Sequence, residues 1–546
     1  MTPPAETLPA ASTTAGGSPG SAVAEGSRRR TFAVISHPDA GKSTLTEALA
    51  LHAAVISEAG AVHGKAGRRG TVSDWMEMER NRGISITSSV LQFGYGDAVI
   101  NLLDTPGHAD FSEDTYRVLA AVDSAVMLLD AAKGLEPQTL KLFEVCRAGR
   151  VPIITVINKW DRPGKEALEL LDEIERTIGL HCTPLNWPVG IAGDFRGLLD
   201  RRTGEYVRFT RTAGGAKAAP QEVLKPVDAE EREGDAWVTA VEESELLSAS
   251  DADLDLEAYL AEQATPVLFS SAVQNFGVRQ LLDALVELAP APAAKPTADG
   301  GERPLDAPFS AYVFKVQAGM DQAHRDKVAY ARVVSGVFER GMVVTHEPTG
   351  KPFHTKYAQA MFGRERTTVE TAYPGDVIGL VNANALRVGD ALYVDEPVRF
   401  PSIPSFAPEH FSVIRAKDTG RYKQFRRGIE QLDQEGVVQV LRSELRGDQA
   451  PVLAAVGPMQ FEVAAYRMEH EFGAVVSMEP LEYSLAMRTT PDAADKLTRL
   501  PGAELMVRSD GQALALFVNR WRYTTVKREN PDLLLEPLVG SSVAGQ

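Results

Sequence analysis

The sequence predicts a multidomain protein of the α/β plus β class, with an N-terminal α/β domain, a β-barrel domain and a C-terminal α+β domain. Three observations lead to this prediction. Buried-strand runs alternate with helical patterns up to about residue 290, which is typical of a mostly parallel sheet with helices on both faces. Short, glycine-punctuated strand patterns such as "KVAYARVVSGVF" and "GDVIGLV" follow and favour a small β-barrel. From about Pro401, helical and strand patterns mix, which indicates an α+β module.

The elements of the N-terminal domain are expected in strict alternation. Its strand runs are Thr31–Ile35, Ala98–Asp104, Ala125–Asp130, Pro152–Asn158 and Pro266–Ser270. Its helical patterns are Ser43–Ala54, Phe111–Ala121 and Pro137–Ala148. In the C-terminal module we expect helices over Lys423–Glu435 and Gln460–Phe472, and strands over Val437–Leu441 and Pro451–Val456. Parallel strands joined by helices bring their carboxyl ends to one edge of the sheet.

Composition suggests the domain boundaries. Residues 1–27 are rich in Ala, Ser, Thr, Gly and Pro and lack an apolar h-region, so we expect a disordered tail over 1–28 and not a signal peptide. Residues 211–262 are acidic and Ala-rich, which predicts a partly helical insertion, and the Pro/Ala/Gly-rich stretch at 291–305 predicts a linker. The expected domains are therefore 29–290, 306–398 for the β-barrel, and 399–546.

Charge and cysteine content narrow the function classes. The chain has 74 acidic and 57 basic side chains, a formal net charge of −17. That balance repels nucleic acid at long range, so we expect no DNA partner, and any RNA contact needs a local basic patch. Cys146 and Cys182 show no CxxC spacing, so we expect neither a disulfide framework nor a zinc site, and a reducing cytoplasm. No apolar run reaches about 18 residues, so no membrane partner is expected.

The first motif is a phosphate-binding loop between a strand and a helix. Its residues in order are Ser36, His37, Pro38, Asp39, Ala40, Gly41, Lys42 and Ser43. Backbone N–H groups at the helix start can bind a β-phosphate, and Gly41 allows close approach because it has no Cβ. Lys42 would bridge β- and γ-phosphate oxygens, and the Ser43 hydroxyl would ligate Mg²⁺. The first position is Ser36 and not glycine, so a chance turn at a helix start is the alternative for this loop taken alone.

The second motif follows the strand Ala98–Asp104 and consists of Asp104, Thr105, Pro106, Gly107 and His108. Asp104 at the strand end can hold a Mg²⁺-bound water. Gly107 can offer its amide to the γ-phosphate with no side chain in the way. Loss of that phosphate removes the contact, so this loop can sense the state of the nucleotide.

The third motif reads the base and consists of Asn158, Lys159, Trp160 and Asp161. Asp161 can accept hydrogen bonds from N1–H and the 2-amino group of guanine, a pair that adenine does not offer. A buried carboxylate without a partner is costly, so this site selects GTP and GDP over adenine nucleotides. Lys159 would lie along the base, and Asn158 would brace the loops.

The fourth motif, Ser271-Ala272, follows the last strand run, and a backbone amide there can read guanine O6. An ordinary strand-end turn is the alternative for each motif taken singly. All four occur in the right order at strand ends, which places them on the edge of an α/β sheet where ligands bind. A metabolic P-loop kinase is another class of protein with a phosphate-binding loop, but such a kinase would have no use for Asn158–Asp161.

The stretch between the first two motifs resembles the translational GTPase family. That family carries Arg-Gly-Ile-Thr-Ile in its first switch, and this chain has Arg82-Gly83-Ile84-Ser85-Ile86. The resemblance implies that Ser85 ligates Mg²⁺, with Thr87 as a weaker competitor. It also implies that His108 positions the attacking water, a role that phosphoryl transfer requires. For this stretch, the alternative interpretation is a helix followed by a core strand with no switch function. For His108, the alternative is a solvated side chain with no catalytic role.

Four further segments of the sequence resemble the bacterial peptide chain release factor 3 family within the translational GTPases. The matching segments are "SDWMEMERNRGISITSSV", "DFSEDTYRVLAAVDSAVMLLDAAKG", "HRDKVAYARVVSG" and "SFAPEHFSVIRAKD". The resemblance implies a monomeric, ribosome-dependent GTPase of translation termination that uses GTP, GDP and Mg²⁺. Its implied partners are the ribosome, including rRNA and ribosomal proteins, and class I release factors. Another ribosomal GTPase, translocase-like or of ribosome-protection type, is the alternative, and a non-catalytic nucleotide-gated scaffold is a third hypothesis.

Two basic clusters remain. Arg415, Lys417, Arg421, Lys423, Arg426 and Arg427 precede and begin a helix. They suit either rRNA phosphates or a solvated, salt-bridged helix face, and the sequence does not decide between these. Arg28–Arg30, before the first strand, are expected to be part of a solubilising tail.

Overall fold

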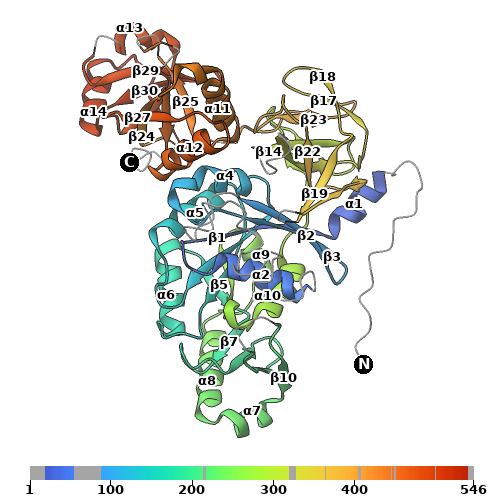
Figure 1. Ribbon diagram of the computed structural model, residues 1–546. Helices are drawn as coiled ribbons and strands as arrows, with labels where there is room; N and C mark the ends of the chain where they lie inside the picture. Colours follow the sequence, from blue (N-terminus) through green and yellow to red (C-terminus); the bar gives the residue numbers. More distant parts are fainter. Residues whose placement is uncertain are drawn as a thin grey trace.

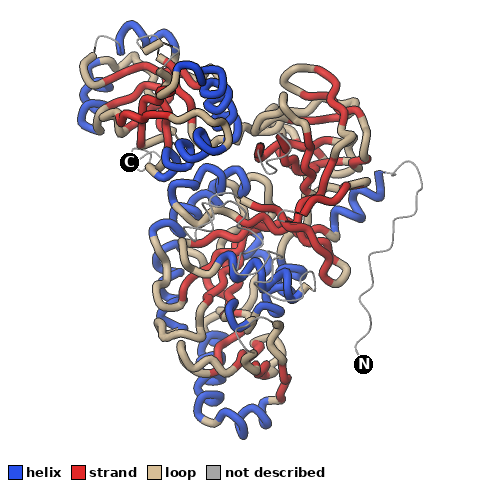
Figure 2. The backbone as a smooth tube through the Cα atoms, in the orientation of Figure 1, coloured by secondary structure: helices blue, strands red, loops and turns tan. Residues whose placement is uncertain are grey.

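The computed structural model describes residues 19–53, 88–212, 217–318, 327–362, 365–403, 407–443, 446–447, 450–497 and 500–538. Figure 1 shows an N-terminal α/β domain, from which a smaller lobe extends at one end. A β-rich domain and a C-terminal domain lie at its other end (Figures 1 and 2). This is the predicted multidomain α/β and β architecture.

The N-terminal domain is built on a mostly parallel sheet. Its strands are β1 (Arg29–Ser36), β2 (Ser89–Tyr95), β3 (Ala98–Asp104), β4 (Ser124–Asp130), β5 (Ile153–Asn158), β6 (His181–Pro184) and β11 (Ala264–Phe269). They lie in the order β2-β3-β1-β4-β5-β11-β6, and β2 alone among these pairs antiparallel, with β3. The parallel strands are apolar along their length because helices cover both faces.

Two separate cores pack against this sheet. Ala33 and Ile35 of β1 belong to the core beneath α4 (Ser112–Leu119), α5 (Pro137–Ala148) and α6 (Ala167–Ile178). Phe32 and Val34 alternate with them and belong to the opposite core, beneath α2 (Lys42–His52) and α10 (Val278–Leu288). Successive residues of a strand face opposite sides, so this single apolar run serves both cores.

The smaller lobe is mixed sheet and helix. Strands β7 (Asn186–Val189), β8 (Gly197–Asp200), β9 (Tyr206–Phe209) and β10 (Gln221–Leu224) form an antiparallel sheet in the order β10-β9-β8-β7. Helices α7 (Pro226–Glu233), α8 (Asp235–Ala249) and α9 (Leu256–Leu260) follow. The sheet therefore begins well before residue 211, where the compositional shift placed the start of the insertion, because β7–β9 have an ordinary composition.

The β-rich domain is a curled antiparallel sheet. Its strands are β14 (Ser310–Ala318), β15 (Lys327–Ser335), β16 (Phe338–Glu339), β17 (Val343–His346), β18 (Lys351–His354), β19 (Ala358–Phe362), β20 (Glu365–Thr368), β21 (Thr371–Ala372), β22 (Val377–Val381) and β23 (Ala391–Tyr393). Phe362 of β19 pairs with Leu91 of β2, so the sheets of the two domains are hydrogen-bonded to each other. A short hairpin, β12 (Lys295–Pro296) with β13 (Glu302–Arg303), occupies the stretch expected as a linker.

The C-terminal domain combines one antiparallel sheet with helices. Its strands are β24 (His410–Ala416), β25 (Gln439–Arg442), β26 (Val452–Ala455), β27 (Val476–Pro480), β28 (Leu485–Thr489), β29 (Ala503–Arg508), β30 (Ala513–Phe517) and β31 (Glu536–Pro537). Its α-helices are α11 (Tyr422–Glu435), α12 (Met459–His470), α13 (Ala494–Leu497) and α14 (Arg520–Glu529). In Figure 1 this domain lies over α4 of the N-terminal domain.

Residues 19–27, expected to be disordered, form helix α1 (Pro19–Ser27), so that prediction was wrong for this part of the chain. Ala22 is fully buried, and a Cβ at Gly26 would contact Pro374 of the β-rich domain at 3.6 Å. Small residues favour a flexible tail in isolation, but here they let the helix pack against a neighbouring domain. Figure 1 shows α1 beside the β-rich domain.

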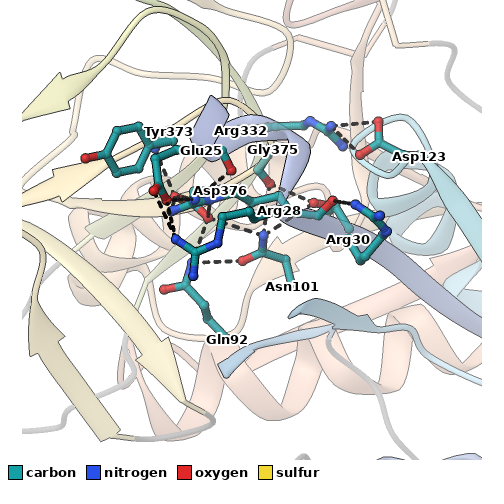
Figure 3. Close-up of polar contacts among 12 residues, drawn as sticks. Glu25, Arg28, Arg30, Gln92, Asn101, Asp123, Arg332, Tyr373, Gly375 and Asp376 are labelled. Atoms are coloured by element: carbon teal, nitrogen blue, oxygen red, sulfur yellow. Dashed lines mark hydrogen bonds and ion pairs between the residues drawn. The ribbon is translucent and has the colours of Figure 1, made fainter. Parts of the chain in front are cut away.

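Arg29 is not part of a solubilising tail either. Its Nε lies 3.3 Å from Asp376 Oδ1, and both side chains are buried. Asp376 Oδ1 also accepts a hydrogen bond from Gln92 Nε2 at 3.0 Å, and its Oδ2 accepts one from the Tyr373 amide at 2.9 Å (Figure 3). This buried network joins the β-rich domain to β1 and β2. Removal of one partner of a buried ion pair typically lowers the free energy of unfolding by several kcal/mol.

The basic cluster 415–427 lies on the surface of the C-terminal domain. Its arginine and lysine side chains are exposed. Arg415 pairs with Glu479 at 3.0 Å, and Arg426 pairs with Glu430 at 3.1 Å.

Candidate nucleotide-binding site

The first motif lies between β1 and α2, as the strand–loop–helix pattern requires. Gly41 has φ 102°, a left-handed conformation that side chains disfavour. A Cβ there would also lie 2.5 Å from Asn158 Nδ2. The Ser36 hydroxyl is buried and makes no hydrogen bond with the described residues. A tight backbone turn with an unsatisfied buried hydroxyl fits a loop that closes around phosphate oxygens.

Lys42 and Asp104 connect the first motif to the second. Lys42 Nζ lies 2.6 Å from Asp104 Oδ1, and both side chains are buried. Asp104 is the last residue of β3, and Ser43 is the second residue of α2. A hydroxyl and a carboxylate in this position fit Mg²⁺, which takes oxygen ligands from one or two side chains together with substrate phosphates and waters.

The second loop lies against the first. The Thr105 hydroxyl donates to Val34 O of β1 at 2.6 Å. A Cβ at Gly107 would lie 3.6 Å from Pro38 Cα, so the two loops approach each other closely at this point. His108 follows at once and keeps a partly exposed side chain, with 31% of it accessible to solvent. The Asp110 amide donates to His108 Nδ1 at 3.2 Å when that nitrogen is unprotonated.

Asn158 braces the loops, as expected for the third motif. Its Nδ2 donates to Ala40 O at 2.9 Å, and its Oδ1 accepts from the Ala272 amide at 2.9 Å. One buried carboxamide thus joins the first, third and fourth motifs. The partners come from distant parts of the chain, and an amide can satisfy a donor and an acceptor at once.

Asp130, which the sequence pattern predicts only as the end of a strand, lies beside the third motif. Its Oδ2 accepts a hydrogen bond from Lys159 Nζ at 2.9 Å, and Lys159 also donates to Asp39 O. Burial raises the pKa of Asp130, but hydrogen bonds from Lys159 and the Ala132 amide outweigh it, so the pKa lies below its usual value. The signal available in the sequence was an acid at the end of a strand adjacent to the third motif's strand.

Asp161 lies beside the fourth motif. Ser271 Oγ donates to Asp161 Oδ1 at 2.5 Å, which fixes the direction of the carboxylate. Trp160, unusual at its place in the motif, is 2% exposed and packs edge-on against Phe269 of β11, with ring centroids 4.9 Å apart. This contact fastens the third motif to the strand that leads into the fourth.

The described site residues therefore meet at the carboxyl ends of β1, β3, β5 and β11, the edge where α/β sheets bind ligands. Phosphate-directed groups lie at one side, and Asp161 with Ser271 and Ala272 at the other. Ser85 and Thr87, the candidates from the first switch, lie outside the described residues.

Family models match the chain in three consecutive stretches. "Elongation factor Tu GTP binding domain" matches residues 27–291, and "Elongation factor G domain 2" matches residues 308–395. "Class II release factor RF3, C-terminal domain" matches residues 400–527. The chain is similar to a solved structure from Thermus thermophilus at 22% identity and TM-score 0.66, which covers 89% of this chain and 71% of that chain and speaks for the fold alone.

Curated relatives are similar over nearly the full length. "Peptide chain release factor 3" of Microcystis aeruginosa is 47% identical over 526 residues, 95% of this chain and 97% of the relative. The protein of that name from Symbiobacterium thermophilum is 46% identical over 512 residues, 93% of this chain and 97% of the relative. Among the described helices, none has the length and apolar character needed to cross a membrane. Similarity of this extent establishes that the chain belongs to the peptide chain release factor 3 family, the GTPases of translation termination.

Proposed function

We propose that this chain is a ribosome-stimulated GTPase whose GTP form promotes dissociation of class I release factors after peptide release. GTP hydrolysis then returns the protein to its GDP form and frees it from the ribosome. It acts as a cytoplasmic monomer, and its partners are the ribosome and class I release factors. The two nucleotide states differ in the partner they prefer, so the γ-phosphate sets the population of each state.

The observation that carries this proposal is the joining of the first, third and fourth motifs by Asn158 and Asp161. Asn158 hydrogen-bonds both Ala40 and Ala272, and Asp161 is oriented by Ser271. The phosphate loop and the base-reading loop are thereby held at a fixed spacing. A site in which a carboxylate must find two donors on the base discriminates strongly against a base that lacks them.

The phosphate end of the site would hold the charge of the triphosphate. Lys42 would bridge the β- and γ-phosphates, and backbone N–H groups from Asp39 to Ser43 would bind the remaining oxygens. Ser43, Asp104 and Ser85 would hold Mg²⁺. When bound, this ion neutralises charge that develops on the phosphate oxygens.

His108 would orient the attacking water, and the Gly107 amide would contact the γ-phosphate. Phosphoryl transfer asks the protein mainly for placement and electrostatic stabilisation, so a correctly turned imidazole is enough for the first task. His108 is partly exposed at the sheet edge, so the ribosome can reach its ring. Activation in trans of this kind supplies about 10⁵-fold in related GTPases.

The test uses ribosomes stalled after peptide release with a labelled class I release factor bound. Dissociation of the factor is followed after addition of this protein with GTP, GDP or a non-hydrolysable GTP analogue. GTP and the analogue should both speed dissociation, whereas GDP should not. If dissociation is the same in all arms, the termination role is wrong. Movement of tRNA in a parallel assay would instead support a translocase-like GTPase.

A further inference from the structure

The contact between the N-terminal and C-terminal domains begins directly after the nucleotide-sensing loop, residues 104–108. Asp110 lies two residues after His108, in the short helix η1 (Ala109–Phe111). Its Oδ2 accepts a hydrogen bond from the Met459 amide, at the first residue of α12, at 2.7 Å. A Cβ at Gly457 would lie 2.1 Å from Asp110 Cγ, so the glycine makes room for this carboxylate.

The same residue also holds the His108 ring. The Asp110 amide donates to His108 Nδ1 at 3.2 Å, and Asp110 Oδ1 lies 3.3 Å from that nitrogen, where it can accept from a protonated ring. The Phe111 ring lies 6.1 Å from the His108 ring, centroid to centroid, and packs with Val463 of α12. Asp110 and Phe111, which contact the His108 side chain, thus also contact α12 of the C-terminal domain.

Helix α4 supplies a second anchor to the same domain. Arg117 Nη1 donates to Glu435 O at 3.2 Å, and its other terminal nitrogen pairs with Glu113 at 2.7 Å. Glu113 Oε2 in turn accepts from Gln439 Nε2 at 3.5 Å. These contacts hold the domains together outside the loop, so the Asp110 contact can change while the domains stay attached.

We propose that Asp110 is a positioning residue that couples docking of the C-terminal domain to the conformation of loop 104–108, and so disfavours GTP relative to GDP. This rests on the proposed roles of Gly107 and His108. The γ-phosphate draws the Gly107 amide toward the nucleotide, whereas the Met459 amide holds Asp110, three residues further on. If the γ-phosphate and the C-terminal domain prefer different conformations of this short loop, binding of one lowers the affinity for the other. This effect is reciprocal.

The test breaks the contact from each side. Asp110→Ala removes the acceptor, and Gly457→Ala places a methyl group where the carboxylate lies. Affinity for a non-hydrolysable GTP analogue and for GDP is measured in the full chain by nucleotide competition. Each variant should bind the GTP analogue about 5- to 10-fold more tightly than the native protein, a change at the lower end of the range for allosteric coupling. The affinity for GDP should stay within about two-fold of the native value. The double variant should gain no more than either single variant, because both disrupt one contact.

Two control variants match the chemistry of the changes. Gly94→Ala adds a methyl group where nothing lies within 4 Å, and Glu482→Ala removes an exposed carboxylate from the C-terminal domain. Neither should alter the ratio of the two affinities. Equal changes in both affinities, or none, in folded Asp110→Ala and Gly457→Ala proteins would overturn the coupling. If Asp110→Ala does not fold, Gly457→Ala alone decides. Failure of the native protein to bind GDP would instead refute the proposed function.

Discussion

Lys42 Nζ lies 2.6 Å from Asp104 Oδ1 in a buried ion pair, so the phosphate loop and the loop after β3 are fixed to each other by charge. Both residues were candidates for the same phosphate and metal chemistry. Their contact also makes each of them part of the stability of the domain, because a buried charge without its partner is strongly destabilising.

Lys42→Ala should therefore damage both stability and binding. It leaves the Asp104 carboxylate buried without its cation, which typically costs about 3–5 kcal/mol of unfolding free energy. It should also abolish measurable GTP binding, because the bridging ammonium is lost. Urea denaturation and nucleotide titration measure the two effects. Lys141→Ala, at an exposed position of α5, is the control and should change neither. Native-like stability and affinity in Lys42→Ala would contradict the assigned role.

Asp161→Asn should change which base is bound. The carboxylate accepts from two donors of guanine, whereas an amide offers a donor that matches the extra carbonyl of xanthine. We expect GTP affinity to fall by about 10²-fold or more and xanthosine triphosphate to gain. Competition between the two nucleotides measures this. Asp172→Asn, which alters an exposed surface pair, should keep guanine preference. Unchanged preference in Asp161→Asn would mean that the base is read elsewhere.

His108→Ala should separate binding from hydrolysis. The described contacts of His108 are with Asp110 and Phe111, which lie outside the four motifs, so GTP and GDP affinities should stay within about two-fold of native. Ribosome-stimulated single-turnover hydrolysis should fall by about 10²-fold or more, the usual effect of removing one group that stabilises a transition state. His410→Ala, at an exposed position, serves as the control. Native turnover by His108→Ala on ribosomes would refute its catalytic role.

Acid should weaken the contact between α4 and the β-rich domain. Burial raises the pKa of Asp114, but the Lys315 ammonium and hydrogen bonds from Ser88 outweigh it and hold the pKa below its usual value. Because this pKa is lower in the folded state, the carboxylate contributes stability that is fully present above about pH 4 and lost as pH falls through the folded value. Unfolding free energies between pH 3 and pH 6 should fall less steeply for Asp114→Asn than for the native protein. Parallel pH profiles for the two proteins would be the contrary result.

The four motifs could be found from sequence because each is short and lies at the end of an apolar strand. Periodicity places the strands, and the chemistry of a nucleotide requires particular residue types directly after them. The multidomain fold was predictable for the same reason, since strand and helix periods differ clearly along this chain.

Other features depend on partners far away in sequence. Arg29 looks like one of several surface arginines until Asp376 is placed beside it. Likewise Asp130 and Lys159 are 29 positions apart, and nothing local shows that they pair. The small residues of α1 favour disorder in isolation. Packing against the neighbouring domain offsets the entropy cost of ordering this helix. Each of these features depends on contacts between residues far apart in the sequence, which local sequence patterns do not report.

Equilibrium binding of purified native protein to GDP and ADP in the presence of Mg²⁺ tests the guanine site itself. We expect tight binding of GDP and a preference for GDP over ADP of at least about 10²-fold, because Asp161 requires two donors on the base. Equal affinity for the two nucleotides would contradict the guanine site and, with it, the roles assigned to the loops around it.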